Sequence, residues 1–143
     1  MEFPLELRSE VERLLSAEDG KALAAAAGRL GRPGNDGSGK RLATSRRDIL
    51  AYAAVRMPAT FGAVSRALEL TLPCLPEDMR DFGSVLDIGA GTGAASHAAF
   101  AAAECGEFTC IEREPEMLSV GRQLTEACGI PAQWKQGDIT AGF

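Results

Sequence analysis

Asp87-Ile-Gly89-Ala-Gly91-Thr-Gly93 is an acidic residue followed by three alternating glycines, between an apolar run, Ser84 to Ile88, and a helix-forming segment, Thr92 to Glu104. Glycines suit such a turn because the chain bends sharply and its backbone approaches a ligand without interference from a Cβ atom. The helix that follows presents free N–H groups and a positive dipole end, which favour a carboxylate or a phosphate. We therefore predict a strand, a ligand-binding turn and a helix; a dinucleotide and a nucleoside-amino-acid both fit.

The same alternation continues along the chain. We expect a second strand over Phe108 to Glu112, a helix over Pro115 to Cys128 and a third strand over Ala132 to Lys135. Strands that alternate with helices are typical of parallel α/β winding, so α/β is the predicted fold class. This pattern occupies residues 83–143, which we predict to be one unit.

The preceding residues, 1–82, have a helical pattern. Helical periodicity covers residues 4–30 and is followed by a Gly-rich connector, residues 31–44. A capping box beginning at Ser45 predicts the start of a second helix. We expect Met57-Pro58 to interrupt that helix, because proline lacks an N–H group, and the helix to resume from Ala59 to Leu72.

Composition excludes several classes of protein. The 143 residues are 45% hydrophobic and 24% charged, which is ordinary for one globular domain. The four cysteines form no C-x-x-C pair and have no histidine at ligand spacing, so we predict neither a metal site nor a disulfide framework. We recognise no targeting signal and no membrane-spanning run, and therefore expect a cytoplasmic protein.

The glycine turn alone leaves two cofactors open. Gly89, Gly91 and Ala94 satisfy the looser dinucleotide pattern G-x-G-x-x-[GA], which would suit NAD. However, Asp87 and Gly93 complete an acid-x-G-x-G-x-G pattern that resembles motif I of class I S-adenosyl-L-methionine-dependent methyltransferases. The resemblance implies that the acid contacts the methionine end of that cofactor, often through water.

Two later positions extend the predicted site. Glu112 ends the second strand, where a carboxylate can accept hydrogen bonds from both ribose hydroxyls. The segment from Glu112 to Leu118, with Pro-Glu-Met-Leu opening the next helix, looks like the methyltransferase version of this turn. The same resemblance implies that Asp138 contacts the adenine amino group and that its apolar neighbour lies against the ring. The predicted cofactor-binding residues are Asp87, Gly89, Ala90, Gly91, Gly93, Glu112, Arg113, Asp138 and Ile139.

No residue is assigned a catalytic role. His97 is the only histidine, and helical exposure or core packing explains it better than general-base chemistry. The sulfonium of the cofactor is already activated, so methyl transfer mainly requires that donor and nucleophile are positioned in line.

Basic residues are concentrated near the start of the second helix. Residues 1–60 carry a net charge of +2, whereas residues 61–143 carry −7. The basic stretch could contact RNA phosphates, and a solvated helix face is the alternative. The predicted RNA-binding residues are Lys40, Arg41, Arg46, Arg47 and Arg56.

The segment Ala51-Tyr-Ala-Ala-Val-Arg-Met-Pro-Ala-Thr-Phe-Gly-Ala-Val64, followed by the glycine motif, is similar to a narrower group. It resembles the small-ribosomal-subunit methyltransferase-like family, bacterial relatives of a mitochondrial ribosome assembly protein. This resemblance, from Leu50 to Leu118, implies ribosomal RNA or the small subunit as partner. Family members carry a cysteine-rich metal or iron–sulfur site in their C-terminal half, to which nothing in these residues corresponds.

The resemblance also implies that the catalytic domain is incomplete here. A class I sheet has seven strands in the order 3-2-1-4-5-7-6, and we expect an incomplete Rossmann-like sheet with only the first three, in the order 3-2-1. The chain would then be a truncated part of a methyltransferase, inactive by itself, with an open edge on its first strand that invites self-association. A non-catalytic assembly factor that retains the fold and an NAD-binding oxidoreductase are the alternatives.

Overall fold

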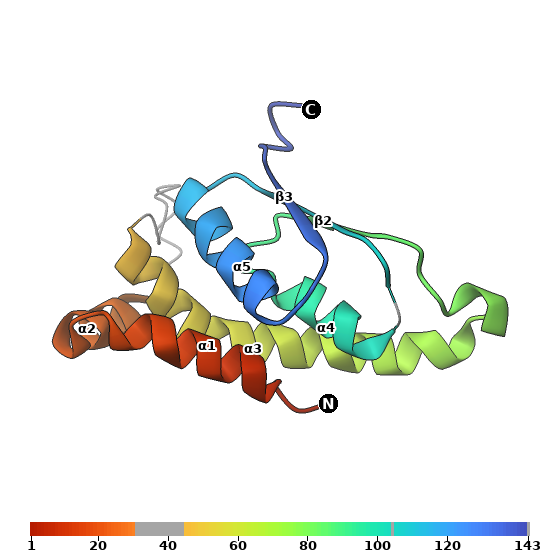
Figure 1. Ribbon diagram of the computed structural model, residues 1–143, viewed down its shortest axis with the longest axis horizontal. Helices are drawn as coiled ribbons and strands as arrows, with labels where there is room; N and C mark the ends of the chain where they lie inside the picture. The colour runs from red at the N-terminus through yellow and green to blue at the C-terminus, as the bar shows by residue number, and fades with distance from the viewer. Residues whose placement is uncertain (31–44, 104, 143) are drawn as a thin grey trace.

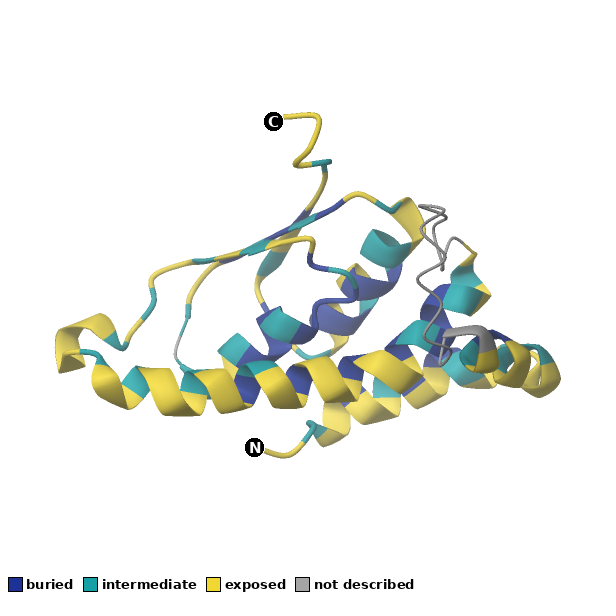
Figure 2. Ribbon diagram, turned by 180° about the vertical axis from the view of Figure 1, so that it is seen from behind, coloured by how far each residue is buried: buried dark blue, intermediate teal, exposed yellow. Residues whose placement is uncertain are grey.

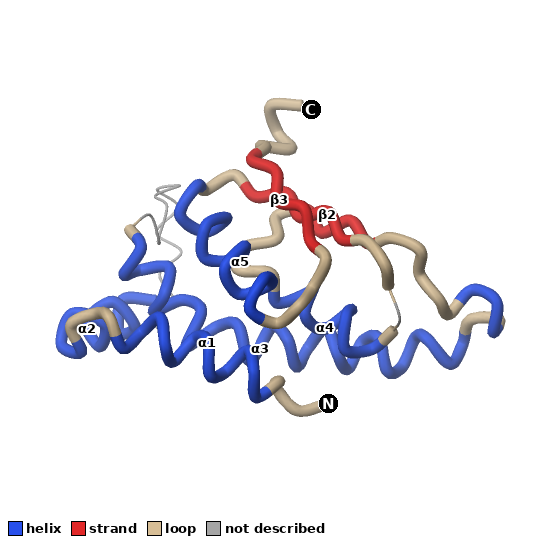
Figure 3. Tube along the Cα trace, viewed as in Figure 1, coloured by secondary structure: helices blue, strands red, loops and turns tan. Residues whose placement is uncertain are grey.

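The computed structural model describes residues 1–30, 45–103 and 105–142. It consists of a three-stranded sheet with helices on one side (Figures 1 and 3). Helices α4 and α5 lie against the sheet, and the N-terminal helices pack on the other side of α4 and α5. The predicted connector, residues 31–44, lies outside the described residues.

The N-terminal part is formed by α1 (Leu5–Ser16), α2 (Gly20–Leu30) and the long α3 (Arg46–Thr71). In α1, Leu7, Val11 and Leu14 are buried at a helical spacing that places them on one face. The predicted cap of α3 is confirmed, since the Ser45 hydroxyl accepts a 3.2 Å hydrogen bond from the Asp48 N–H. Two short 3₁₀ turns, Leu72–Cys74 and Glu77–Met79, lead from α3 to the sheet.

The expected interruption at Met57-Pro58 is wrong, because α3 runs continuously through Pro58. A proline inside a helix removes one hydrogen bond and costs about 3 kcal/mol. Met57 and Phe61 are each 1% exposed on the buried face of the same helix, while Pro58 is exposed. Burial of this face on both sides of the proline therefore outweighs the local cost.

The sheet is made of β1 (Val85–Ile88), β2 (Phe108–Glu112) and β3 (Ala132–Gln136), joined by α4 (Ala94–Ala102) and α5 (Pro115–Ala127). All pairings are parallel and β2 is central, so the predicted order 3-2-1 is confirmed. Helix α4 starts two residues later than expected because Gly93 has a left-handed conformation.

One buried cluster joins the N-terminal helices to the helices of the sheet. It contains Leu7, Ile49 and Met57 together with Val120 and Leu124 of α5. The buried segments accordingly gather where helices meet one another and the sheet (Figure 2). The division of the chain at residues 82 and 83 stays a prediction.

The two faces of the sheet differ in exposure. Phe108 and Cys110 of β2 are fully buried under the helices. Leu86 and Ile88 of β1 point the other way and are 59% and 47% exposed. Among the described residues, β1 pairs along its length only with β2.

Candidate cofactor-binding site

A cavity of about 360 Å³ lies at the carboxyl ends of the parallel strands. Cofactor sites of α/β proteins are found at this end of the sheet, because the loops that leave adjacent strands converge there. The volume is in the range of small-molecule sites. The cavity is lined by Gly89, Glu112, Arg113, Gly137, Asp138, Ile139 and Thr140.

The glycine loop forms one wall. Gly89, Gly91 and Gly93 have φ angles of 69°, 59° and 88°, a region that other residues rarely adopt. The N–H groups of Gly89 and Ala90 both donate to the Ile111 carbonyl, at 2.9 and 3.0 Å, which ties the loop to β2. A Cβ atom at Gly89 or Gly91 would meet nothing within 4 Å. Backbone conformation, not crowding, therefore requires these two glycines, and space beside them is open to a ligand.

The Glu112 carboxylate joins the loop to the next turn. Its side chain is buried, and it accepts hydrogen bonds from the N–H groups of Gly91 at 2.8 Å and Glu114 at 2.9 Å. An ionised carboxylate has about four acceptor positions, so two bonds leave capacity for ribose hydroxyls. Glu112 thus holds the glycine loop in addition to lining the cavity, a role that the sequence pattern did not indicate.

Asp87 points toward α4. Its Oδ2 atom accepts a 2.7 Å hydrogen bond from the hydroxyl of Ser96, which also lies 3.3 Å from the Cys110 sulfur. Ser96 and Cys110 are fully buried, and burial raises the pKa of the Cys110 thiol. The structure thus places Asp87 beside the loop but not among the cavity-lining residues. Ser96 was missed because a serine inside a helix has no motif of its own.

The turn after β3 forms the opposite wall. Asp138 accepts hydrogen bonds from the N–H and the hydroxyl of Thr140, at 2.9 and 2.6 Å. Gln136 donates a 3.3 Å hydrogen bond to the Arg113 carbonyl, so the ends of β2 and β3 are linked. Ile139 is 57% exposed and offers an apolar surface at the cavity. Thr140 had not been predicted, since its role in this turn appears only in three dimensions.

The structure therefore gathers five predicted residues around the cavity, and Ala90, Gly91 and Gly93 adjoin it in the loop. The five are Gly89, Glu112, Arg113, Asp138 and Ile139.

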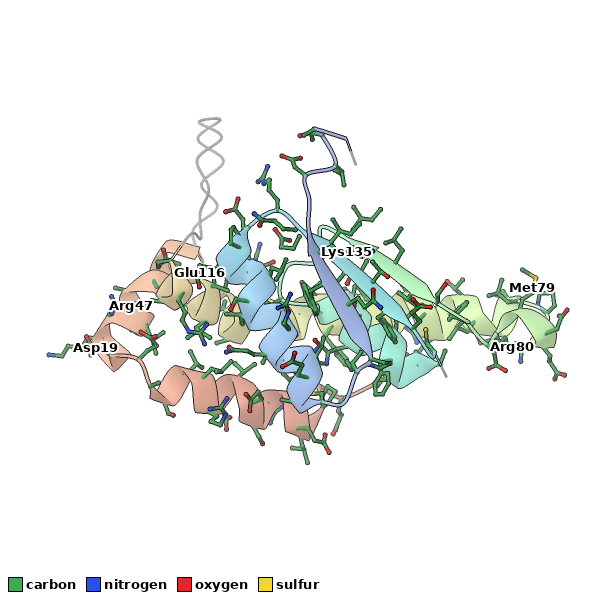
Figure 4. All side chains as sticks on the ribbon, turned by 45° about the horizontal axis from the view of Figure 1, so that its top comes forward. Asp19, Arg47, Met79, Arg80, Glu116 and Lys135 are labelled. Atoms are coloured by element: carbon green, nitrogen blue, oxygen red, sulfur yellow. The ribbon has the colours of Figure 1, made fainter. Side chains whose placement is uncertain are left out.

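The described residues of the predicted basic stretch, Arg46, Arg47 and Arg56, do not line this cavity. Lys40 and Arg41 fall outside the described residues. Arg46 donates to the Gln123 side chain at 2.8 Å, and Arg47 lies 3.6 Å from Glu18. Arg47 is at the α2 end of the molecule, opposite Met79 and Arg80 (Figure 4). Arg56 is exposed on α3.

His97 is packed in the core, which is one of the two explanations that the sequence favoured over general-base chemistry. It is 3% exposed, and burial lowers its pKa to about 4, so the imidazole is neutral near pH 7. In the part of the chain that the structure describes, no group of three His, Cys, Asp or Glu residues is arranged to hold a metal ion. Nor is any described helix long and apolar enough to cross a membrane.

Comparison with solved structures shows the fold. A candidate S-adenosyl-L-methionine-dependent methyltransferase from Methanococcus maripaludis is 16% identical, with a TM-score of 0.52 over 71% of this chain and 46% of that chain. A candidate RNA methyltransferase from Pyrococcus horikoshii is 26% identical, with a TM-score of 0.48 over 62% of this chain and 42% of that one. The chain thus spans less than half of the length of either protein.

Comparison with curated proteins gave no match. The sequence model of the mitochondrial small ribosomal subunit Rsm22 family, in contrast, matches residues 46–141. The matched region includes α3, the whole sheet and every residue around the cavity. Because it covers more than half of the chain, the protein belongs to the Rsm22 family.

Proposed function

We propose that the cavity at the carboxyl ends of β1, β2 and β3 binds S-adenosyl-L-methionine, as the cofactor site of a methyltransferase that acts on or binds ribosomal RNA of the small subunit. The observation that carries the proposal is the convergence of the glycine loop, the Glu112 carboxylate and the Gly137–Thr140 turn on one cavity. Family membership supports the ribosomal partner.

The residues present suit each part of this cofactor. The open space beside Gly89 and Gly91 admits a ligand against the loop backbone, near the start of α4. The spare acceptor positions of Glu112 suit the ribose hydroxyls, and exposed Ile139 suits the adenine ring. When bound, S-adenosyl-L-methionine supplies a methyl group on an activated sulfonium, so these residues need only bind and orient it.

Charge favours this cofactor over NAD. The cavity and its loop carry Glu112, Asp138 and Asp87, with Arg113 as the only basic residue lining the cavity among those described. A cationic sulfonium is attracted by such a surface, whereas the pyrophosphate of a dinucleotide would find one basic side chain in the cavity lining.

Calorimetric titration with S-adenosyl-L-methionine, S-adenosylhomocysteine and NAD tests the cofactor assignment. We expect the first two to bind and NAD not to bind. Glu112→Gln should weaken binding about tenfold or more, since it removes the charge proposed to accept from the ribose hydroxyls and one of the two oxygens that hold the Gly91 and Glu114 N–H groups. Glu107→Gln is the matched control. Glu107 is exposed and immediately precedes β2, at the other end of the strand from Glu112, so this change should leave affinity unchanged. Binding of NAD alone, or equal effects of the two variants, would contradict the assignment.

The partner proposal has a separate test. If Lys40, Arg41, Arg46, Arg47 and Arg56 contact RNA phosphates, affinity for a small-subunit ribosomal RNA transcript should fall steeply with salt. Arg56→Gln should reduce the salt slope by about one contact, whereas Arg80→Gln, which lies outside the basic stretch and at the other end of the molecule from Arg47, should not. An unchanged slope in Arg56→Gln would exclude that residue from the interface.

A further inference from the structure

Trp134, the only tryptophan, is fixed behind the glycine loop. It lies in the middle of β3 on the face toward α5 and is 8% exposed. Its indole N–H donates a 3.0 Å hydrogen bond to the hydroxyl of Thr125, which is 1% exposed. The Thr125 hydroxyl in turn lies 3.1 Å from the Gly121 and Arg122 carbonyls of α5. A buried hydrogen bond to a helix therefore determines where the ring lies.

Two glycines allow the ring to occupy this position. A Cβ atom on Gly121 of α5 would lie 2.7 Å from Cζ2 of the indole, a distance that real Cβ contacts do not show. A Cβ atom on Gly93 would lie 3.3 Å from the same ring carbon. The indole is thus enclosed between the backbone of α5 and the backbone of the glycine loop. Ala90, also in the loop, belongs to the same buried cluster as Trp134 and Cys110.

Gly93 connects the loop to α4. Its N–H donates to the Ala90 carbonyl at 2.8 Å, and its carbonyl accepts from the His97 N–H at 2.9 Å, the first turn of α4. A shift of Gly93 would therefore move both the loop and the N–H groups that begin α4. Gly93 has no side chain, and the atoms nearest to its Cβ position belong to the indole, followed by a methyl group of Thr125.

We infer that Trp134 is a positioning residue for the cofactor site, which holds the loop at Gly93 and Ala90 in the shape that receives the ligand. β3 continues directly into the Gly137–Thr140 turn, so the same strand supports the loop wall and forms the opposite wall. This inference rests on the proposed cofactor function, which it deepens. Because β3 both contains Trp134 and leads into the Gly137–Thr140 turn, it sets the separation between the glycine loop and that turn.

The first test needs no ligand. Amide hydrogen exchange at residues 91–95 should be about tenfold faster in Trp134→Leu than in the wild type, because a smaller side chain leaves space behind the loop. Trp134→Phe retains an aromatic ring and should restore part of the protection. Phe108→Leu is the control: Phe108 is also buried, but it is the first residue of β2, at the end of that strand away from the glycine loop. Exchange at the loop should be unchanged in that variant.

The second test is affinity for S-adenosylhomocysteine at a temperature at which all variants are folded. Trp134→Leu should bind about tenfold more weakly or worse, Trp134→Phe should be intermediate, and Phe108→Leu should match the wild type. In the wild type, the emission of the single tryptophan should change on binding, because the indole contacts the loop that receives the ligand.

The outcomes separate the two proposals. Wild-type binding with unchanged exchange and affinity in Trp134→Leu would overturn the inference and leave the proposed function intact. Absence of wild-type binding would refute the proposed function, and the ligand-free exchange rates would still decide whether Trp134 holds the loop. Equal losses in Trp134→Leu and Phe108→Leu would show a general effect on stability and would also overturn the inference.

Discussion

The two faces of the sheet carry similar apolar residues in very different surroundings. On the face covered by helices α4 and α5, Phe108 and Cys110 are fully buried. On the other face, Leu86 and Ile88 are largely exposed. Apolar residues on both sides of a strand are typical of parallel sheets that are covered on both faces. The difference teaches that β1 has the composition of an internal strand, while the described residues cover it on one side only.

The largest expected difference between the faces is in stability. Leu124→Ala on α5 should lower the free energy of unfolding by about 3 kcal/mol, because the side chain is fully buried and leaves a cavity. Leu86→Ala, the same chemical change on the open face, should alter it by about 0.5 kcal/mol or less. Urea denaturation measures both. Equal losses would mean that Leu86 is covered in solution.

A second, smaller effect is the pH dependence of stability, which arises from His97, a buried residue of α4 on the helix-covered side of the sheet. The pKa of His97 is about 4 in the folded protein and about 6.5 in an unfolded chain, because burial disfavours the charged imidazole. The unfolded state therefore binds more protons between these values, and the full stabilisation is present above pH 6.5. Stability should fall by about 2 kcal/mol from pH 7 to pH 5 and continue to fall toward pH 4.

His97→Leu is the control for this prediction, because it removes the titrating group from the same buried position. Unfolding measured at pH 7, 6 and 5 should show a shallower pH dependence in the variant. An identical slope in both proteins would assign the pH dependence to carboxylates elsewhere.

Substitutions on the open face should have a small effect on stability but a clear effect on self-association. We propose that the β1 edge and the adjoining Leu86 and Ile88 mediate self-association, since unpaired strand edges pair with other chains. The double change Leu86→Gln and Ile88→Gln should alter unfolding by less than about 1 kcal/mol but lower the mass measured by light scattering. Leu70→Gln, an equally exposed site on α3, is the control. A wild-type mass of one chain at high concentration would refute the proposal.

Much of the fold and of the candidate site was accessible from the sequence because the relevant signals are local. The glycines at 89, 91 and 93 have positive φ angles, which glycine adopts more readily than any other residue. The second strand has the predicted bounds. The acidic residue Glu112 was predicted at the site because it ends that strand. Its hydrogen bond to the Gly91 N–H, across 21 positions in sequence, was not predictable in the same way.

By itself, the sequence determined the alternation of strands and helices, the sharp glycine turn and the cap at Ser45. Each of these depends on backbone preference or periodicity within a short segment. Only the tertiary structure decided that α3 continues through Pro58, that Ser96 binds Asp87 and that Trp134 lies against Gly93. The physical reason is that burial and side-chain contact between distant segments compete with local preference, and their outcome depends on which surfaces the complete fold brings together.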